Sequence, residues 1–208
     1  MTPDPITGRV AAGGSPQPGA TVLALRGREV LGVATTGHDG RFALEAQAPD
    51  TLLAKVRGDV IGVACAAAGA EVDLEVGPVH QVTVEARGDV PEGFELQLAP
   101  RALADLADEQ LALVHVPVDG MSESMFASRP LPADAPLRFG LQAGLWLLYA
   151  ALESAPDALG ADMERRAWTV ERAALASGEP LEAGPVGHLL EVRGDVTVVL
   201  DVVEVAVS

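Results

Sequence analysis

The sequence predicts an all-β protein made of two antiparallel β-sandwiches, with one short helix in the second sandwich. Short apolar runs recur along the chain, and several of them alternate apolar and polar residues with the period of two that is typical of strands. The 22 glycines and 15 prolines fall largely between these runs, where turns are needed. A chain of 208 residues is long enough for one large or two small cores. Because only 3% of the residues are aromatic, Val, Leu and Ala must fill these cores.

Four strands are predicted in the first stretch of the chain. They cover residues 6–10, 21–25, 30–36 and 41–45, each too short for a helix and bounded by glycine, proline or polar turns. His38-Asp39-Gly40 forms the last of these turns, and Gly40 is free to take a positive φ there.

This stretch resembles a known family. The segments PGATV at 18–22 and TGHDGRFAL at 36–44 are similar to the carboxypeptidase regulatory-like domain, a prealbumin (transthyretin)-type β-sandwich. The resemblance covers residues 1–78 and implies an Ig-like or prealbumin-like fold that serves as an accessory or binding module. Some related pilin-type sandwiches close a Lys–Asn or Lys–Asp isopeptide bond, but this chain has no Asn and its one lysine, Lys55, lies in a late strand.

The first sandwich is predicted to end near residue 78. Strands are predicted at 51–56, 60–67 and 71–76, and Gly77-Pro78 then follows as a linker. We therefore divide the chain into a carboxypeptidase regulatory-like sandwich at 1–78 and a second, acidic sandwich at 79–208. Residues 1–78 are expected to fold when expressed alone.

The second half is predicted to contain more strands and one helix. An Ala- and Leu-rich segment at 102–111 predicts the helix, with Pro100 near its start. The apolar run at 137–152 is interpreted as two strands joined at Ala143-Gly144, although a helix stays open as the alternative. The other predicted strands are 81–86, 94–98, 113–116, 168–174, 188–192 and 196–205.

The net charge of −16 excludes two classes of partner. Residues 1–78 carry nine acidic and six basic residues, whereas 79–208 carry 21 acidic and eight basic residues. Without a basic patch, the chain is expected to bind neither nucleic acid nor an anionic membrane surface. The acidic excess fits a role in solubility.

The sequence also predicts a compartment. Cys65 is the only cysteine and lies in an apolar run, so an inert buried thiol is expected. No signal peptide and no apolar segment near the length of about 20 residues that spans a bilayer is recognised. We expect a cytoplasmic protein, and the preference for Arg over Lys suggests a bacterial source.

No catalytic, cofactor-binding or metal-binding residue is predicted. The four histidines are scattered, and no HExxH or CxxC motif brings metal ligands together. His115 and Asp119 are close enough in sequence to face one another, but a plain surface histidine is the simpler interpretation. Since no nucleophile elbow or phosphate-binding glycine motif occurs either, we expect a protein that is not an enzyme.

Three Arg-Gly-Asp tripeptides begin at Arg57, Arg87 and Arg193. An exposed Arg-Gly-Asp suggests adhesion, but Gly-Asp is also ordinary turn chemistry after a strand. We favour the turn interpretation and take the repetition as support for two related sandwiches.

One loop is predicted to contact a partner. The segment at 119–130 has the composition of a surface loop, yet it contains Met121, Met125 and Phe126. Exposed Met beside an aromatic residue is typical of adaptable contact surfaces. The alternative is that Phe126 covers the second core as a lid.

The predicted function is therefore non-enzymatic: a β-sandwich module for protein–protein interaction or assembly, with a protein partner or a second copy. One alternative is a carbohydrate- or peptide-binding sandwich that uses Trp146, Trp168 or Tyr149, although core filling explains these aromatic residues equally. The other alternative is an enzyme whose site is assembled from separate loops.

Overall fold

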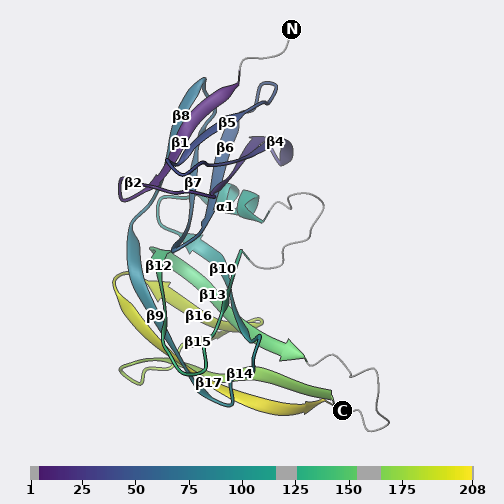
Figure 1. Ribbon diagram of the computed structural model, residues 1–208, viewed down its shortest axis with the longest axis vertical. Coiled ribbons are helices and arrows are strands. Elements are labelled where there is room, and N and C mark those ends of the chain that lie inside the picture. The colour runs from purple at the N-terminus through teal and green to yellow at the C-terminus, as the bar shows by residue number, and fades with distance from the viewer. Residues whose placement is uncertain (1–4, 116–125, 154–164, 208) are drawn as a thin grey trace.

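The computed structural model describes residues 5–115, 126–153 and 165–207 (Figure 1). It is almost wholly β, with one short helix in the described residues, and this confirms the predicted all-β class. The strands of the first half are β1 (Ile6–Ala12), β2 (Ser15–Pro16), β3 (Thr21–Arg26), β4 (Glu29–Thr35), β5 (Arg41–Leu44), β6 (Thr51–Arg57), β7 (Val60–Ala67) and β8 (Glu71–Val76). The elements of the second half are β9 (Val79–Gly88), β10 (Glu95–Leu103), α1 (Asp108–Val114), β11 (Ala127–Pro130), β12 (Leu137–Gln142), β13 (Gly144–Glu153), β14 (Arg165–Leu175), β15 (Glu182–Gly184), β16 (Gly187–Val192) and β17 (Val196–Val207).

The first sandwich packs two small sheets face to face. In one sheet, β1 pairs with β2, β5 and β8. The facing sheet has the order β7-β6-β3-β4. Between them lies the first core, a cluster built around Val10, Val22, Leu44, Leu52 and Leu74. The turn after β4 closes as predicted, because Gly40 has a φ of +74°.

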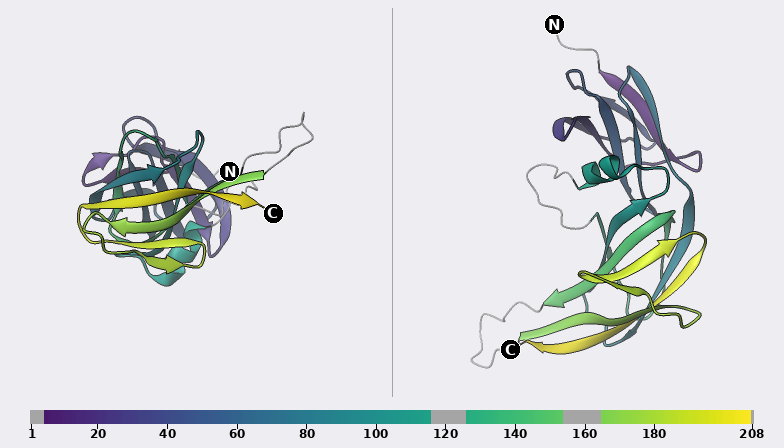
Figure 2. Two further views of the ribbon diagram at one scale, coloured as in Figure 1. Left: turned by 90° about the horizontal axis from the view of Figure 1, so that it is seen from below. Right: turned by 180° about the vertical axis from the view of Figure 1, so that it is seen from behind.

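The second sandwich is built in the same way from longer strands. Its strands lie in two layers, β14-β17-β9-β12 and β11-β10-β13-β16-β15, which are joined where β13 pairs with β14. Leu96, Trp146 and Leu190 from one sheet meet Val82 and Leu200 from the other. Figures 1 and 2 show this sandwich below the first one along the long axis of the molecule.

Three strands of the first sandwich are buried on both faces. Successive residues in a strand point to opposite sides, so Val22 and Ala24 of β3 enter the first core while Leu23 and Leu25 point away from it. The outward residues of β3, β6 and β7 join the core of the second sandwich, and we call this joint cluster the shared core. Burial on both faces explains why the run at 21–25 is continuously apolar instead of alternating.

Hydrogen bonds join the two sandwiches into one sheet. β12 pairs in parallel with β7 at Gly140 and Leu141, and the Gly140 N–H donates to the Asp59 carbonyl at 2.7 Å. After Leu141 the backbone pairing with β7 ends, and a side chain supplies the next hydrogen-bond acceptor. The Oε1 of the buried Gln142 accepts the Val63 N–H at 2.7 Å. The predicted linker at residues 77–78 does lie between β8 and β9, but the shared core takes residues from both sides of it.

The helix lies later in the chain than predicted. Residues 102 and 103 belong to β10, and α1 covers Asp108–Val114. Pro100 lies inside β10, where the register with β13 shifts, and a bulge is a position at which a strand tolerates proline. The strand predicted at 113–116 is wrong at Leu113 and Val114, which form the last residues of α1. Val114 packs into the shared core from the end of this helix.

The strand pairing is mixed, not wholly antiparallel as predicted. The pairs β1–β8, β12–β7 and β17–β9 are parallel. The segment at 137–152 does form two strands, β12 and β13, with Gly144 at their junction. Within the described residues, no helix is long and apolar enough to cross a membrane.

Candidate contact site

Helix α1 sits at the junction of the two sandwiches. Its first turn is closed by Gln110, whose side-chain carbonyl accepts the Ala107 N–H at 3.1 Å. Asp108 and Glu109 also lie in this turn, where negative charge complements the helix dipole. On the inner side Leu111 and Val114 pack against the shared core. The other side of the helix is left facing the first sandwich.

The opposite wall is the turn between β3 and β4 together with the start of β6. The carboxylate of Asp50 accepts the Gly27 N–H at 3.0 Å, and the Asp50 N–H donates to the Leu25 carbonyl at 2.9 Å. The Arg26 guanidinium donates to the Ala48 carbonyl and holds the neighbouring loop. These hydrogen bonds fix the wall without any contribution from α1.

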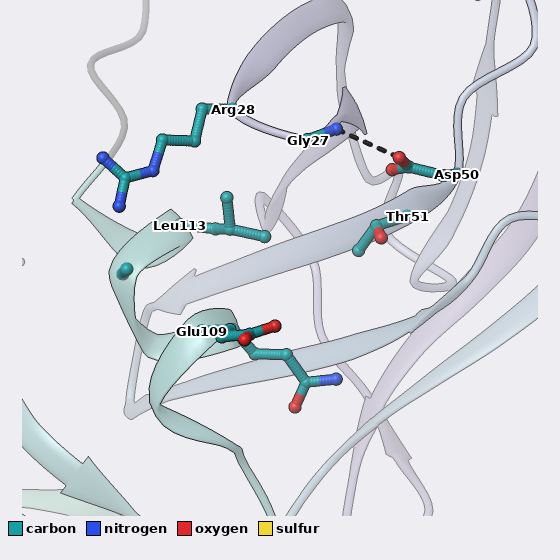
Figure 3. A pocket seen from close by; sticks show the side chains of 8 residues that line it. Gly27, Arg28, Asp50, Thr51, Glu109 and Leu113 are labelled. Carbon is teal, nitrogen blue, oxygen red and sulfur yellow. Dashed lines mark hydrogen bonds between the residues drawn. The ribbon is translucent and has the colours of Figure 1, made fainter.

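Between the two walls lies a groove of about 590 Å³, which we call the α1 groove (Figure 3). Its lining residues come from both sandwiches: Gly27, Arg28, Asp50, Thr51, Glu109, Gln110, Ala112 and Leu113. Figure 3 shows Arg28, Asp50 and Glu109 on three separate elements around the opening. All three are exposed, whereas Leu113 is half-buried. The groove therefore offers both signs of charge beside the apolar side chains of Ala112 and Leu113.

His115 follows α1 and is exposed at the junction, within electrostatic reach of two cations. The pKa of its imidazole is lowered below 6.5, first by desolvation and then by the ammonium group of Lys55, with a smaller effect from Arg101. A hydrogen bond with the Pro100 backbone acts in the opposite direction. Lys55, the only lysine of the chain, is 2% exposed. Desolvation and these two cations therefore favour the neutral form of the imidazole.

The predicted contact loop is only partly within the described residues. Met121 and Met125 lie outside them, so the contact hypothesis stays a prediction for these two residues. Phe126 is buried at 2% exposure, with its ring centroid 6.1 Å from that of Trp146 and the Arg57 guanidinium 5.4 Å above it. Phe126 thus takes the lid position of the alternative hypothesis and is not a surface contact.

The aromatic residues considered for ligand binding have different positions. Trp146 is fully buried, and its Nε1 donates to the Gln142 carbonyl at 2.8 Å, so it fills the core. Trp168 is half-buried and packs against the shared core, and Tyr149 is half-buried. A ligand that stacked on Trp146 would have to enter the core.

Two of the three Arg-Gly-Asp tripeptides lie at turns after strands, whereas Arg87 and Gly88 of the second lie within β9 and pair with β17. Arg57 covers the ring of Phe126, and Arg193 forms an ion pair with Glu191. The Asp195 carboxylate accepts the Gln81 N–H at 2.9 Å. These three side chains have partners within the chain, and the turn interpretation holds for the first and third tripeptides.

No group of three His, Cys, Asp or Glu side chains with a geometry suited to a metal ion occurs in the part of the chain that the structure describes. Asp119, considered as a partner of His115, lies outside that part. Cys65 is half-buried, and burial raises the pKa of its thiol above 9.0. The thiol is therefore less buried than expected, and its inertness stays a prediction.

The sequence did not reveal the α1 groove. Its residues come from three segments near positions 27, 50 and 110, which are brought together only by the packing of the second sandwich on the first. The Arg-Gly and Asp-Thr pairs that form the wall look like ordinary turn chemistry in the sequence.

Comparisons with known proteins add little. No family model matches the chain, and no curated protein matches it. Among solved structures, fervidolysin from Fervidobacterium pennivorans, a keratinolytic enzyme related to subtilisin, matches at 11% identity and a TM-score of 0.30, over 91% of this chain and 30% of that chain. The Bacillus anthracis TIE protein matches at 10% identity and a TM-score of 0.25, over 97% of this chain and 50% of that chain. This chain therefore spans half or less of either structure.

Proposed function

We propose that this protein is a non-enzymatic module for protein–protein interaction or assembly, and that a protein partner docks in the α1 groove. The observation that carries the proposal is the construction of the groove: both sandwiches supply its walls, and hydrogen bonds hold the Asp50 wall in place. A pre-formed surface of this kind loses little conformational entropy on binding. The resemblance of residues 1–78 to an accessory domain points in the same direction.

The exposure of the lining favours a protein partner over a small molecule. Small-molecule sites bury about 70–90% of their ligand within mostly apolar walls. Here Arg28, Asp50, Glu109 and Ala112 are exposed, and Leu113 is the main apolar contribution. Such a surface suits a protruding loop that covers the groove from outside.

The charges that line the α1 groove indicate which side chains the partner loop should carry. The groove carries the carboxylates of Asp50 and Glu109 against one guanidinium, and the whole chain carries a net charge of −16. A partner with a basic side chain next to an apolar one is complementary to this arrangement, and the net charge would speed its approach. A cytoplasmic location is part of the proposal, since the lone Cys65 suits a compartment without disulfides.

Site-specific photocrosslinking in the source organism tests the proposal. A photoreactive amino acid at Ala112, which is exposed in the groove, is expected to give one defined protein adduct. The matched control is Val186, which is 52% exposed in the β15–β16 turn beside the middle of β13, away from the groove. The change Glu109→Lys should weaken the Ala112 adduct by reversing a charge that the partner meets. Equal adducts at both positions, or none at Ala112, would refute the groove as the docking site.

A further inference from the structure

Strand β4 is the edge strand at one end of the continuous sheet that runs through both sandwiches. It pairs with β3 on one side, and no strand is paired with its other side among the described residues. Over seven residues it is longer than the other edge strands of this sheet, since β11 has four residues and β15 has three. A long free edge presents unpaired backbone donors and acceptors to any strand that approaches.

The ladder register shows which backbone groups are free. The Thr36 N–H donates to the Ala20 carbonyl at 2.9 Å, so Thr36 belongs to a hydrogen-bonded pair with β3. Because such pairs alternate along an antiparallel ladder, Ala34 also faces β3, whereas Val33 and Thr35 direct their N–H and C=O outward. Among the residues that the structure describes, no hydrogen-bond partner is found for the outward backbone groups of Val33 and Thr35, and both residues are exposed, Val33 at 44%.

This edge lacks the usual protection against pairing. Native edge strands commonly carry charges, prolines or bulges that keep other strands away. The edge strand β8 is protected by charge, because Glu71, Asp73 and Glu75 are exposed along it. In β4 the only charged residue is Glu29 at its start, and the bulge near Val30 leaves residues 32–35 in regular register with β3.

We propose that β4 pairs antiparallel with β4 of a second copy of this chain and joins two sheets across a two-fold axis. Pairing centred on Ala34 places Val33 opposite Thr35 of the second copy and Thr35 opposite its Val33. Each outward-facing residue then meets an outward-facing residue, and the two pairs exchange four backbone hydrogen bonds. Val and Thr are β-branched, and their cross-strand contact stabilises antiparallel sheets.

The charge distribution favours a second copy at this edge. A symmetric dimer brings the same surface of both copies together, so its own charge opposes it. The 78 residues that contain β4 carry nine acids and six bases, whereas the remainder carries 21 acids and eight bases. Contact through β4 therefore joins the less negative halves. The inference rests on the proposed interaction function by naming one partner, yet it uses a different surface from the α1 groove.

The test measures self-association of the full chain by analytical ultracentrifugation from micromolar to near-millimolar concentration. We expect a concentration-dependent dimer. The variant Val33→Pro should weaken dimerisation at least tenfold, because it removes one outward N–H from each copy. It should leave the melting temperature unchanged, since proline is tolerated where a strand N–H faces solvent. The control Val33→Ala keeps the N–H and should still dimerise.

Amide hydrogen exchange of the unaltered chain provides the second readout. The amides of Val33 and Thr35 should exchange fast in dilute solution and become protected in the dimer, while that of Ala34 is protected in both. A chain that stays monomeric over the whole range would overturn the inference. So would a dimer that Val33→Pro does not weaken, or one without new protection at Val33 and Thr35. If the proline variant does not fold, the exchange result alone decides. The Ala112 crosslink tests the groove separately, so either proposal can fail alone.

Discussion

Replacing Gln142 by leucine perturbs the junction at one hydrogen bond. Gln142 is 1% exposed, and its Oε1 accepts the Val63 N–H where β12 and β7 separate. Leucine has a similar volume but no acceptor, so Val63 keeps a buried N–H without a partner. Such a group costs about 1–3 kcal/mol. With a loss of about 2 kcal/mol, the melting temperature of a chain of this size should fall by about 4–8 °C.

Calorimetry and urea unfolding of Gln142→Leu measure this loss. Gln47→Leu is the matched control, because the Gln47 side chain is exposed and the same change there should stay within about 0.5 kcal/mol. If Gln142→Leu unfolds at the wild-type temperature, the side-chain hydrogen bond does not stabilise the junction and the reasoning fails.

Three further predictions concern the turn, the junction and metal. Gly40→Ala should cost at least about 2 kcal/mol in urea unfolding, because φ is +74° and the new Cβ would lie 2.6 Å from the Val10 carbonyl oxygen. Gly13→Ala, with φ at +55° and no heavy atom within 4 Å, should cost only about 1 kcal/mol, and equal losses would contradict the steric argument. The pKa of His115 is lowered on folding, so its contribution to the free energy of unfolding is present above pH 6.5 and is lost as the pH falls below that value. The variant His115→Gln should therefore lose less stability than the wild-type chain between pH 7 and pH 5. An unchanged pH profile would rule out this linkage. Chelator should leave the melting temperature of the purified protein unchanged, and about one zinc per chain in elemental analysis would refute this prediction.

Local pattern predicted most of the strands. Clean alternation identified β8, with Val72, Leu74 and Val76 on one face, and β-branched residues identified β17. The glycine at 144 correctly separated β12 from β13. These features depend on residues that are close together in the sequence, so they can be recognised from the sequence alone.

Features that depend on distant packing were not predicted. Pro100 suggests a helix start because proline is favoured in the first turn of a helix, whereas the bulge that accommodates it in β10 arises from pairing with β13. The apolar run containing Leu23 indicated a buried strand but not that its outer face belongs to a second core. For the same reason the α1 groove, which exists only where that face meets α1, left no recognisable pattern.

The sharing of one core by both sandwiches is the central claim, because the α1 groove requires both to be in place. Differential scanning calorimetry of the full chain tests it most directly. The shared core and the β7–β12 pairing predict a single transition whose calorimetric enthalpy equals the van't Hoff enthalpy. Two separate transitions, one for residues 1–78 and one for the remainder, would contradict it.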